Sequence, residues 1–225
     1  MLNKRIFKIA VLLGFIYFVL LLLTLPHYGI NWDTINHLPR GQAYLNYFLT
    51  GKKDYSNLPI YQAYWQDPSS LLIKSDKPKS EIVRRSLYEN NGFTFQDLMG
   101  WDGRGHPPLS DIISSLFNKI LFGKLGLIND IDSYRVYGIL LASFLIGLVF
   151  YWTSTYFGSL AGFVSALSLA TYPLFWSESH FNTEKDVPEA VYWSFFLFIL
   201  SKGIIKKNIK TILNNIWIEI KKILS

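Results

Sequence analysis

The sequence contains no cysteine, so no disulfide holds any part of the chain together. It also lacks a His-Glu-x-x-His metal motif, a glycine-rich phosphate loop and a Gly-x-Ser-x-Gly nucleophile turn. Charged residues make up 17% of the chain, yet residues 9–25 and 136–177 contain none. Short motifs therefore indicate no function, and the uncharged runs carry the first structural information.

These uncharged runs predict transmembrane helices, because a helix crosses the hydrocarbon core with about 20 predominantly apolar residues. The first run predicts a crossing at about 6–25. The second is too long for one crossing, and the turn-forming residues 156–159 divide it into helices at about 136–155 and 160–175. A weaker segment at about 187–205 has a charged residue near each end, where it can reach the interface.

Net positive charge is concentrated in the two tails, with +3 before the first helix and +5 after the fourth, against +1 for residues 26–135. Lysine and arginine favour the cytoplasmic side, so both termini are predicted to be cytoplasmic and residues 26–135 to form an external loop. The sequence thus predicts an all-α integral protein of the cell membrane with four transmembrane helices and a partly helical outer loop. The net charge of +6 follows from this orientation and requires no nucleic-acid partner.

Both ends of the chain are predicted to interact with membrane lipids. The amino-terminal segment is leucine-rich up to Leu25 without a small-x-small cleavage pattern, which predicts a retained anchor. Residues 206–225 form a basic amphipathic pattern, which predicts a helix on the cytoplasmic membrane surface.

Two helices are predicted inside the outer loop. One follows Pro39 and stops at Gly51. The other spans residues 110–123, with Ser110 as its cap, Gly123 as its stop and an apolar stripe on one side. This stripe suits packing onto the bundle and burial in the outer membrane interface equally well.

Polar residues gather where the chain leaves and re-enters the outer face. Asp33 follows the first predicted crossing, and Asp186 immediately precedes the fourth. A third cluster, residues 101–109, precedes the second helix of the loop and contains Arg104 and His106. We expect the three clusters to converge on one site at the interface, where a lipid-linked phosphate would present its head group.

Each of these residues also has a purely structural interpretation. Asp186 and Glu189 have the spacing of a capping box, and Asp33 could cap a turn ahead of Pro39. His37 and His106 lie among aromatic residues, where a histidine is usually a hydrogen-bonded packing residue.

The order of these features resembles the amino-terminal part of the GT-C superfamily of membrane glycosyltransferases, in its protein O-mannosyltransferase and aminoarabinose transferase-like branch. The resemblance covers about residues 28–205 of a transmembrane domain predicted at 1–205. Its matching elements, in order, are Asp33 with His37, His106-Pro107-Pro108-Leu109, Arg135, Phe157-Gly158, Pro173, and His180 with Asp186-Val187-Pro188. Two features depart from the family pattern. Thr34 stands where many members have a second acidic residue, and relatives are usually longer, with more crossings.

The resemblance implies transfer of a sugar from a polyprenyl-phosphate carrier to a protein, lipid or glycan acceptor on the outer face. It implies that Asp33 is the catalytic base and Asp186 a second catalytic carboxylate. Residues expected to bind substrate, chiefly the phosphate, are His37, Arg104, His106, His180 and Lys185. Some relatives use a divalent metal ion, although the sequence contains no recognisable ligand set. The alternative is a non-catalytic membrane subunit or scaffold derived from such an enzyme.

Overall fold

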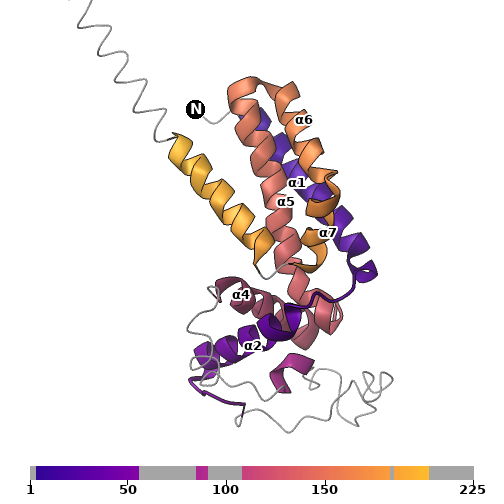
Figure 1. The fold of residues 1–225 in the computed structure, drawn as a ribbon, viewed down its shortest axis with the longest axis vertical. Coiled ribbons are helices and arrows are strands. Elements are labelled where there is room, and N and C mark those ends of the chain that lie inside the picture. The colour runs from indigo at the N-terminus through magenta and orange to yellow at the C-terminus, as the bar shows by residue number, and fades with distance from the viewer. Residues whose placement is uncertain (1–3, 56–84, 91–107, 183–184, 203–225) are drawn as a thin grey trace, which may run out of the picture.

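The computed structural model describes residues 4–55, 85–90, 108–182 and 185–202, and everything regular within these ranges is helical (Figure 1). The prediction of an all-helical chain is therefore confirmed for this part of the protein. The helices form two layers, a bundle of long apolar helices and a pair of shorter helices lying across one end of the bundle (Figure 1).

The bundle is built around α5 (Asp130–Phe157), which packs against α1 (Lys4–Thr24) on one side and against α6 (Ser159–Ala170) on another. A further helix, residues 186–202, lies beside α5 and contributes Val191 to the same core. Two described helices, α1 with the turn that follows it and α5, are long and apolar enough to cross a membrane. The core between them consists of large apolar side chains and tyrosines, among them Tyr17, Leu21, Ile139 and Phe150.

The turn predicted between the second and third crossings is present at Gly158. Its φ of 90° lies in the region that residues with a side chain rarely adopt, so a glycine suits this turn. The helix that precedes it, α5, starts at Asp130, earlier than predicted, because Asn129 caps it by accepting a hydrogen bond from the Asp132 backbone N–H at 2.8 Å.

The third crossing, predicted as one helix at about 160–175, is wrong in this form. The helix α6 ends at Ala170, and α7 (Pro173–Phe181) continues at an angle of 60° to it. Pro173, one of the elements of the family resemblance, occupies the first turn of α7, where its missing N–H costs no hydrogen bond. Together, α6 and α7 are apolar enough for a third candidate span, provided that one span can contain this bend.

The fourth predicted crossing is described only as far as residue 202. The remainder of that segment and the predicted surface helix at residues 206–225 lie outside the described residues. Four crossings therefore remain a prediction.

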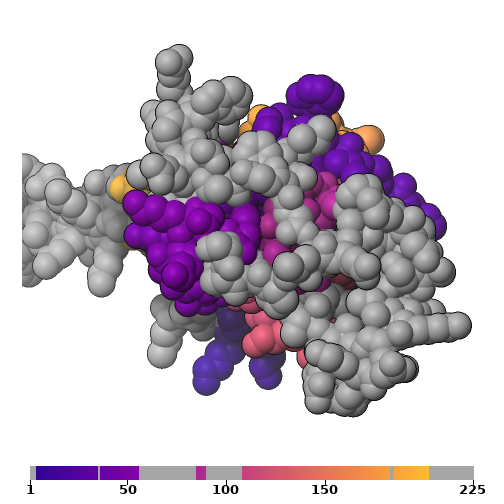
Figure 2. Space-filling model, turned by 90° about the horizontal axis from the view of Figure 1, so that it is seen from below, coloured from indigo at the N-terminus to yellow at the C-terminus, as the bar shows by residue number. Residues whose placement is uncertain are grey.

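The second layer consists of α2 (Thr34–Thr50) and α4 (Leu109–Asn118), which lie across the end of the bundle where α5 begins (Figure 1). The short helix η1 (Leu25–His27) leads into this layer from α1, and η5 (Leu87–Asn90) packs against α2. Figure 2 views the molecule from this end, where α2 lies at the surface. Gly51 ends α2 as predicted, with a φ of 71°, but the helix begins at Thr34 and so contains Pro39.

The predicted ends of the second loop helix are wrong. Pro108 occupies the N-cap position of α4 without a side-chain cap, and Ser110 is buried inside the helix. Gly123 does not stop the helix either, because the chain continues through a π-helical turn, η6 (Lys119–Lys124).

Polar and apolar side chains of α4 are placed in an unusual way. Polar side chains are buried against α2 and α5, whereas members of the apolar stripe such as Leu116 and Ile120 are exposed. The buried polar residues are Ser110, Asp111, Ser114, Ser115 and Asn118. The side of α4 that packs most closely is therefore the polar one, whereas the apolar side is only partly covered.

Candidate functional site

Asp33 and Lys185 form an ion pair between two of the polar segments that were predicted to converge, the one after the first crossing and the one before the fourth. The Oδ2 atom of Asp33 lies 2.6 Å from Nζ of Lys185, and the two side chains are 33% and 26% exposed. Asp33 stands at the N-cap position of α2, but its side chain makes no capping hydrogen bond. The capping role considered for Asp33 is therefore wrong, and its carboxylate is directed to the segment that precedes the 186–202 helix.

Asp186 follows Lys185 directly and begins this helix. Its carboxylate accepts a hydrogen bond from the side-chain amide of Asn182, at the end of α7. The N–H of Glu189 donates to the backbone carbonyl of Lys185 at 2.8 Å, as in an ordinary helical turn. Asp186 thus connects the 186–202 helix to the end of α7, while its neighbour Lys185 forms the ion pair with Asp33.

His180 has a packing role. Its ring is fully buried and stacks on Tyr28, with 3.8 Å between ring centroids. Its Nδ1 lies 2.7 Å from the carbonyl oxygen of Trp176 and must donate to it, which leaves Nε2 to accept from the Thr24 hydroxyl at 2.8 Å. Nδ1 thus bonds within α7 and Nε2 bonds to the end of α1, so neither ring nitrogen is available to a ligand and the geometry does not support substrate binding by His180.

His37 also lies in a buried cluster. Its Nδ1 is 3.0 Å from Asp111 Oδ1 and 2.9 Å from Arg40 Nη2, while Arg40 Nε donates to Asp111 Oδ2 at 2.7 Å. The three side chains join α2 to the polar face of α4. The structure therefore gives His37 the packing role that the sequence left open as an alternative.

Arg135 fixes the segment that leads from α1 to Asp33. Its guanidinium donates to the backbone carbonyls of Tyr28, at 3.0 Å, and Gly29, and also pairs with Asp132 at 3.2 Å. Arginine offers several donors in a rigid planar fork, so it can hold two carbonyls and a carboxylate together. Arg135 therefore holds the segment that precedes Asp33, and the sequence had singled it out only as one element of the family resemblance.

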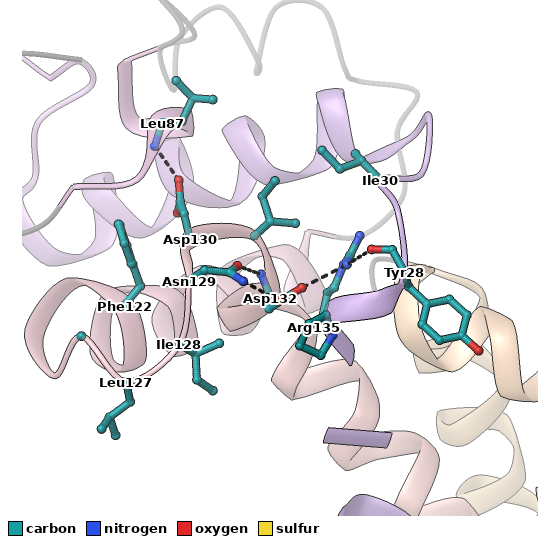
Figure 3. Close-up of a pocket in the computed structure, with 13 residues that line it drawn as sticks. Tyr28, Ile30, Leu87, Phe122, Leu127, Ile128, Asn129, Asp130, Asp132 and Arg135 are labelled. Carbon is teal, nitrogen blue, oxygen red and sulfur yellow. Dashed lines mark hydrogen bonds and ion pairs between the residues drawn. The ribbon is translucent and has the colours of Figure 1, made fainter. Parts of the chain in front are cut away.

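A cavity of about 560 Å³ lies beside this arginine, between the segment after α1 and the loop before α5 (Figure 3). Its polar wall is made by Asn129, Asp130, Asp132 and Arg135. These side chains hydrogen-bond to one another or to nearby residues, as the dashed lines in Figure 3 show for Asp132 and Asp130. The polar groups that line this cavity are therefore already bonded to the protein, and they hold the segment after α1 and the Leu87 turn against the start of α5.

The remaining predicted site residues, Arg104 and His106, lie outside the described residues. Within the described ranges, no three histidine, aspartate or glutamate side chains gather in a way that could hold a metal ion.

The model of the dolichyl-phosphate-mannose-protein mannosyltransferase family matches residues 105–217, half of the chain. The chain belongs to this family. Comparisons with curated proteins and with solved structures found no match.

The match to the mannosyltransferase family covers Lys185 and Asp186 but not Asp33. The ion pair joins the unmatched amino-terminal part, including α1 and α2, to the matched part at Lys185. Family membership supports a membrane glycosyltransferase and does not favour a non-catalytic scaffold.

Proposed function

We propose that the chain transfers a sugar from a polyprenyl-phosphate carrier to an acceptor at the outer face of the membrane, with Asp33 and Lys185 at the centre of the site. The observation that supports this proposal most directly is their ion pair, which places a carboxylate and an ammonium group together at one end of the helix bundle. Membership of a mannosyltransferase family supports mannose as the first sugar to test.

In the proposed reaction, an acceptor hydroxyl attacks the anomeric carbon of the sugar, and the bond from that carbon to the phosphate oxygen breaks. The hydroxyl proton passes to the Asp33 carboxylate as the new bond forms. The electron pair of the broken bond leaves with the lipid phosphate, and the Lys185 ammonium stabilises the resulting charge. Attack from the side opposite the leaving phosphate inverts the anomeric centre.

Exchange of partners at Lys185 would couple donor binding to base activation. A partly exposed ion pair contributes at most about 1 kcal/mol, because water screens both charges. The phosphate of the donor can therefore replace Asp33 as the partner of Lys185 at little cost. Asp33 is then released toward the acceptor hydroxyl only when a donor is bound. Asp186, held by Asn182, keeps Lys185 in position in this scheme.

The outward-facing stripe of α4 supports a site at the membrane interface. The exposed Leu109 and Leu116 of α4, with Ile120 of η6, would lie among the lipids, while the polar face of α4 holds α2 and the start of α5. A donor whose chain remains in the membrane would then present its phosphate at the level of Lys185.

The experiment that tests this function uses membranes containing the full chain, a labelled polyprenyl-phosphate mannose and cell-envelope acceptors. Sugar should appear on an acceptor from the lipid-linked donor and not from a nucleotide sugar added in its place. Transfer from the nucleotide sugar, or no transfer from any polyprenyl-phosphate sugar, would contradict the proposal.

The proposed orientation predicts which side of the membrane each layer faces. Because the chain has no cysteine, single cysteines introduced by Lys53→Cys and Lys8→Cys can be labelled individually. In intact cells an impermeant thiol reagent should label the Lys53→Cys protein, after α2, and not the Lys8→Cys protein, at the start of α1. Labelling of Lys8→Cys alone would reverse the orientation.

A further inference from the structure

A second cavity opens on the side of the bundle, between α1, α5 and the 186–202 helix. Its volume is about 820 Å³, within the range of about 300–1,000 Å³ that is common for small-molecule sites. Apart from Ser143 and Lys202 its side chains are apolar or aromatic, and its two glycines belong to α1 and α5. The hydroxyl of Ser143 donates to the backbone carbonyl of Ile139 at 2.6 Å, so it offers little to a polar ligand.

Glycines form the floor of this cavity because the backbones of α1 and α5 touch there. A Cβ atom on Gly14 would lie 2.9 Å from the Ser143 carbonyl oxygen, and one on Gly147 would lie 2.8 Å from that of Ala10. Aromatic side chains form a wall, with Phe144 and Phe195 packed edge to face at a centroid distance of 5.7 Å. The result is a slot, too small for a whole transmembrane helix about 10 Å across and 30 Å long, but suited to a flexible hydrocarbon chain.

Lys202 lies at one end of this slot and is exposed. Its ammonium nitrogen lies 4.2 Å from the ring centroid of Phe198 and 5.2 Å from that of Tyr151, so two aromatic faces hold the cation at the mouth of the slot. Figure 1 shows the 186–202 helix leaning away from α5 toward this end, where α1 begins. A fixed cation at the mouth of an apolar slot is complementary to a ligand with an anionic head and an apolar tail.

We propose that this slot binds one anionic phospholipid from the leaflet on the side of residues 4 and 202. Its phosphate pairs with Lys202, and an acyl chain lies against Gly14, Gly147 and the aromatic wall. The lipid is distinct from the sugar donor, because Lys185 and Lys202 mark opposite ends of one helix. At 1.5 Å per residue those ends are about 25 Å apart. The proposal therefore does not depend on the proposed transferase activity.

Native mass spectrometry of the purified full chain tests this proposal, with dioleoyl phosphatidylglycerol and dioleoyl phosphatidylcholine as competing probes. We expect one phosphatidylglycerol to be retained in preference to phosphatidylcholine. Lys202→Met should weaken its retention about fivefold, the factor that corresponds to about 1 kcal/mol for one lysine near an anionic lipid. Lys8→Met should leave retention unchanged, because Lys8 is exposed near the same end of the bundle but does not line the slot.

A second pair of variants tests the apolar part of the site. Val11 and Leu12 are neighbours on α1 with exposures of 56% and 55%, but only Val11 lines the slot. Val11→Trp should fill the slot and abolish retention of the lipid, whereas Leu12→Trp should not. Equal effects of both tryptophans, or of both lysine variants, would overturn the proposal in favour of general attraction to the membrane surface. Lys202-dependent preference for polyprenyl phosphate over phosphatidylglycerol, or a dimer that Val11→Trp dissociates, would also overturn it.

Discussion

Asp33→Asn should lower the rate of sugar transfer by about 10²- to 10⁴-fold, the usual contribution of a positioned general base. Asparagine keeps the size of the side chain and can still contact Lys185, but it cannot accept the acceptor proton. We therefore expect the variant to insert into the membrane and to bind donor, with the loss confined to turnover. The measurement is the initial rate of transfer at saturating donor, with protein amount determined in the same membranes.

The matched control for this variant is Asp54→Asn. Asp54 is an exposed aspartate after α2, and its backbone carbonyl accepts a hydrogen bond from the Asn46 side chain. Its replacement should leave the rate within the error of the assay. Undiminished transfer by the Asp33→Asn protein, with the wild type active, would remove Asp33 from the role of base.

Arg40→Met should destabilise the protein by about 3–5 kcal/mol, because it leaves a buried carboxylate without its cation. Asp111 is 1% exposed and lies 2.5 Å from Arg40 Nη2, so it has no access to water that could replace the arginine. The measurement is thermal unfolding of the purified protein in detergent. Lys53→Met serves as the control, since loss of an exposed cation usually changes stability by less than about 0.5 kcal/mol.

A double variant separates the unpaired charge from other effects of this substitution. Arg40→Met combined with Asp111→Leu replaces both charges by apolar groups and should recover much of the lost stability, because replacing a whole buried ion pair is often nearly neutral. A single Arg40→Met protein as stable as the wild type would show that the cluster of His37, Arg40 and Asp111 does not hold α2 to α4.

The long helices of the bundle could be predicted because they depend on local composition. The uncharged runs predict α1 and α5, and the glycine positions predict the turns at Gly51 and Gly158. The break between α6 and α7 was missed because the apolar composition continues across it. Only the position of Pro173 carried a signal, and it suits the start of a helix as well as the end of one.

The histidines and the polar face of α4 show the limit of sequence reasoning at this site. The sequence cannot tell whether His37 points to a cavity or to Asp111, because the partner is 74 residues away on another helix. The spacing of polar residues on α4 carried a signal that was overlooked. Ser110, Asp111, Ser114, Ser115 and Asn118 share one side, as do the apolar residues opposite them, so either side could have been the packed one.

The approach of the Asp33 segment to the segment of Lys185 and Asp186 could be predicted, but the individual contact could not. The predicted topology places the two chain segments at the same membrane depth and on the same side, which restricts where they can meet. The sequence could not select Lys185 over Asp186 as the partner, because the two are adjacent and the choice depends on how the 186–202 helix is rotated against α5. Tertiary contacts such as that of Tyr192 with Tyr137 set this rotation.

The most direct test of the account is zero-length carbodiimide coupling of the wild-type chain, which joins a carboxylate to an amine only where the two are in contact. Mass spectrometry should detect an amide bond between Asp33 and Lys185, and polyprenyl phosphate should lower its yield by taking Asp33's place at Lys185. A chain that gives no such linkage, or whose linkage is as abundant with polyprenyl phosphate as without it, would contradict a site in which these two residues receive the donor.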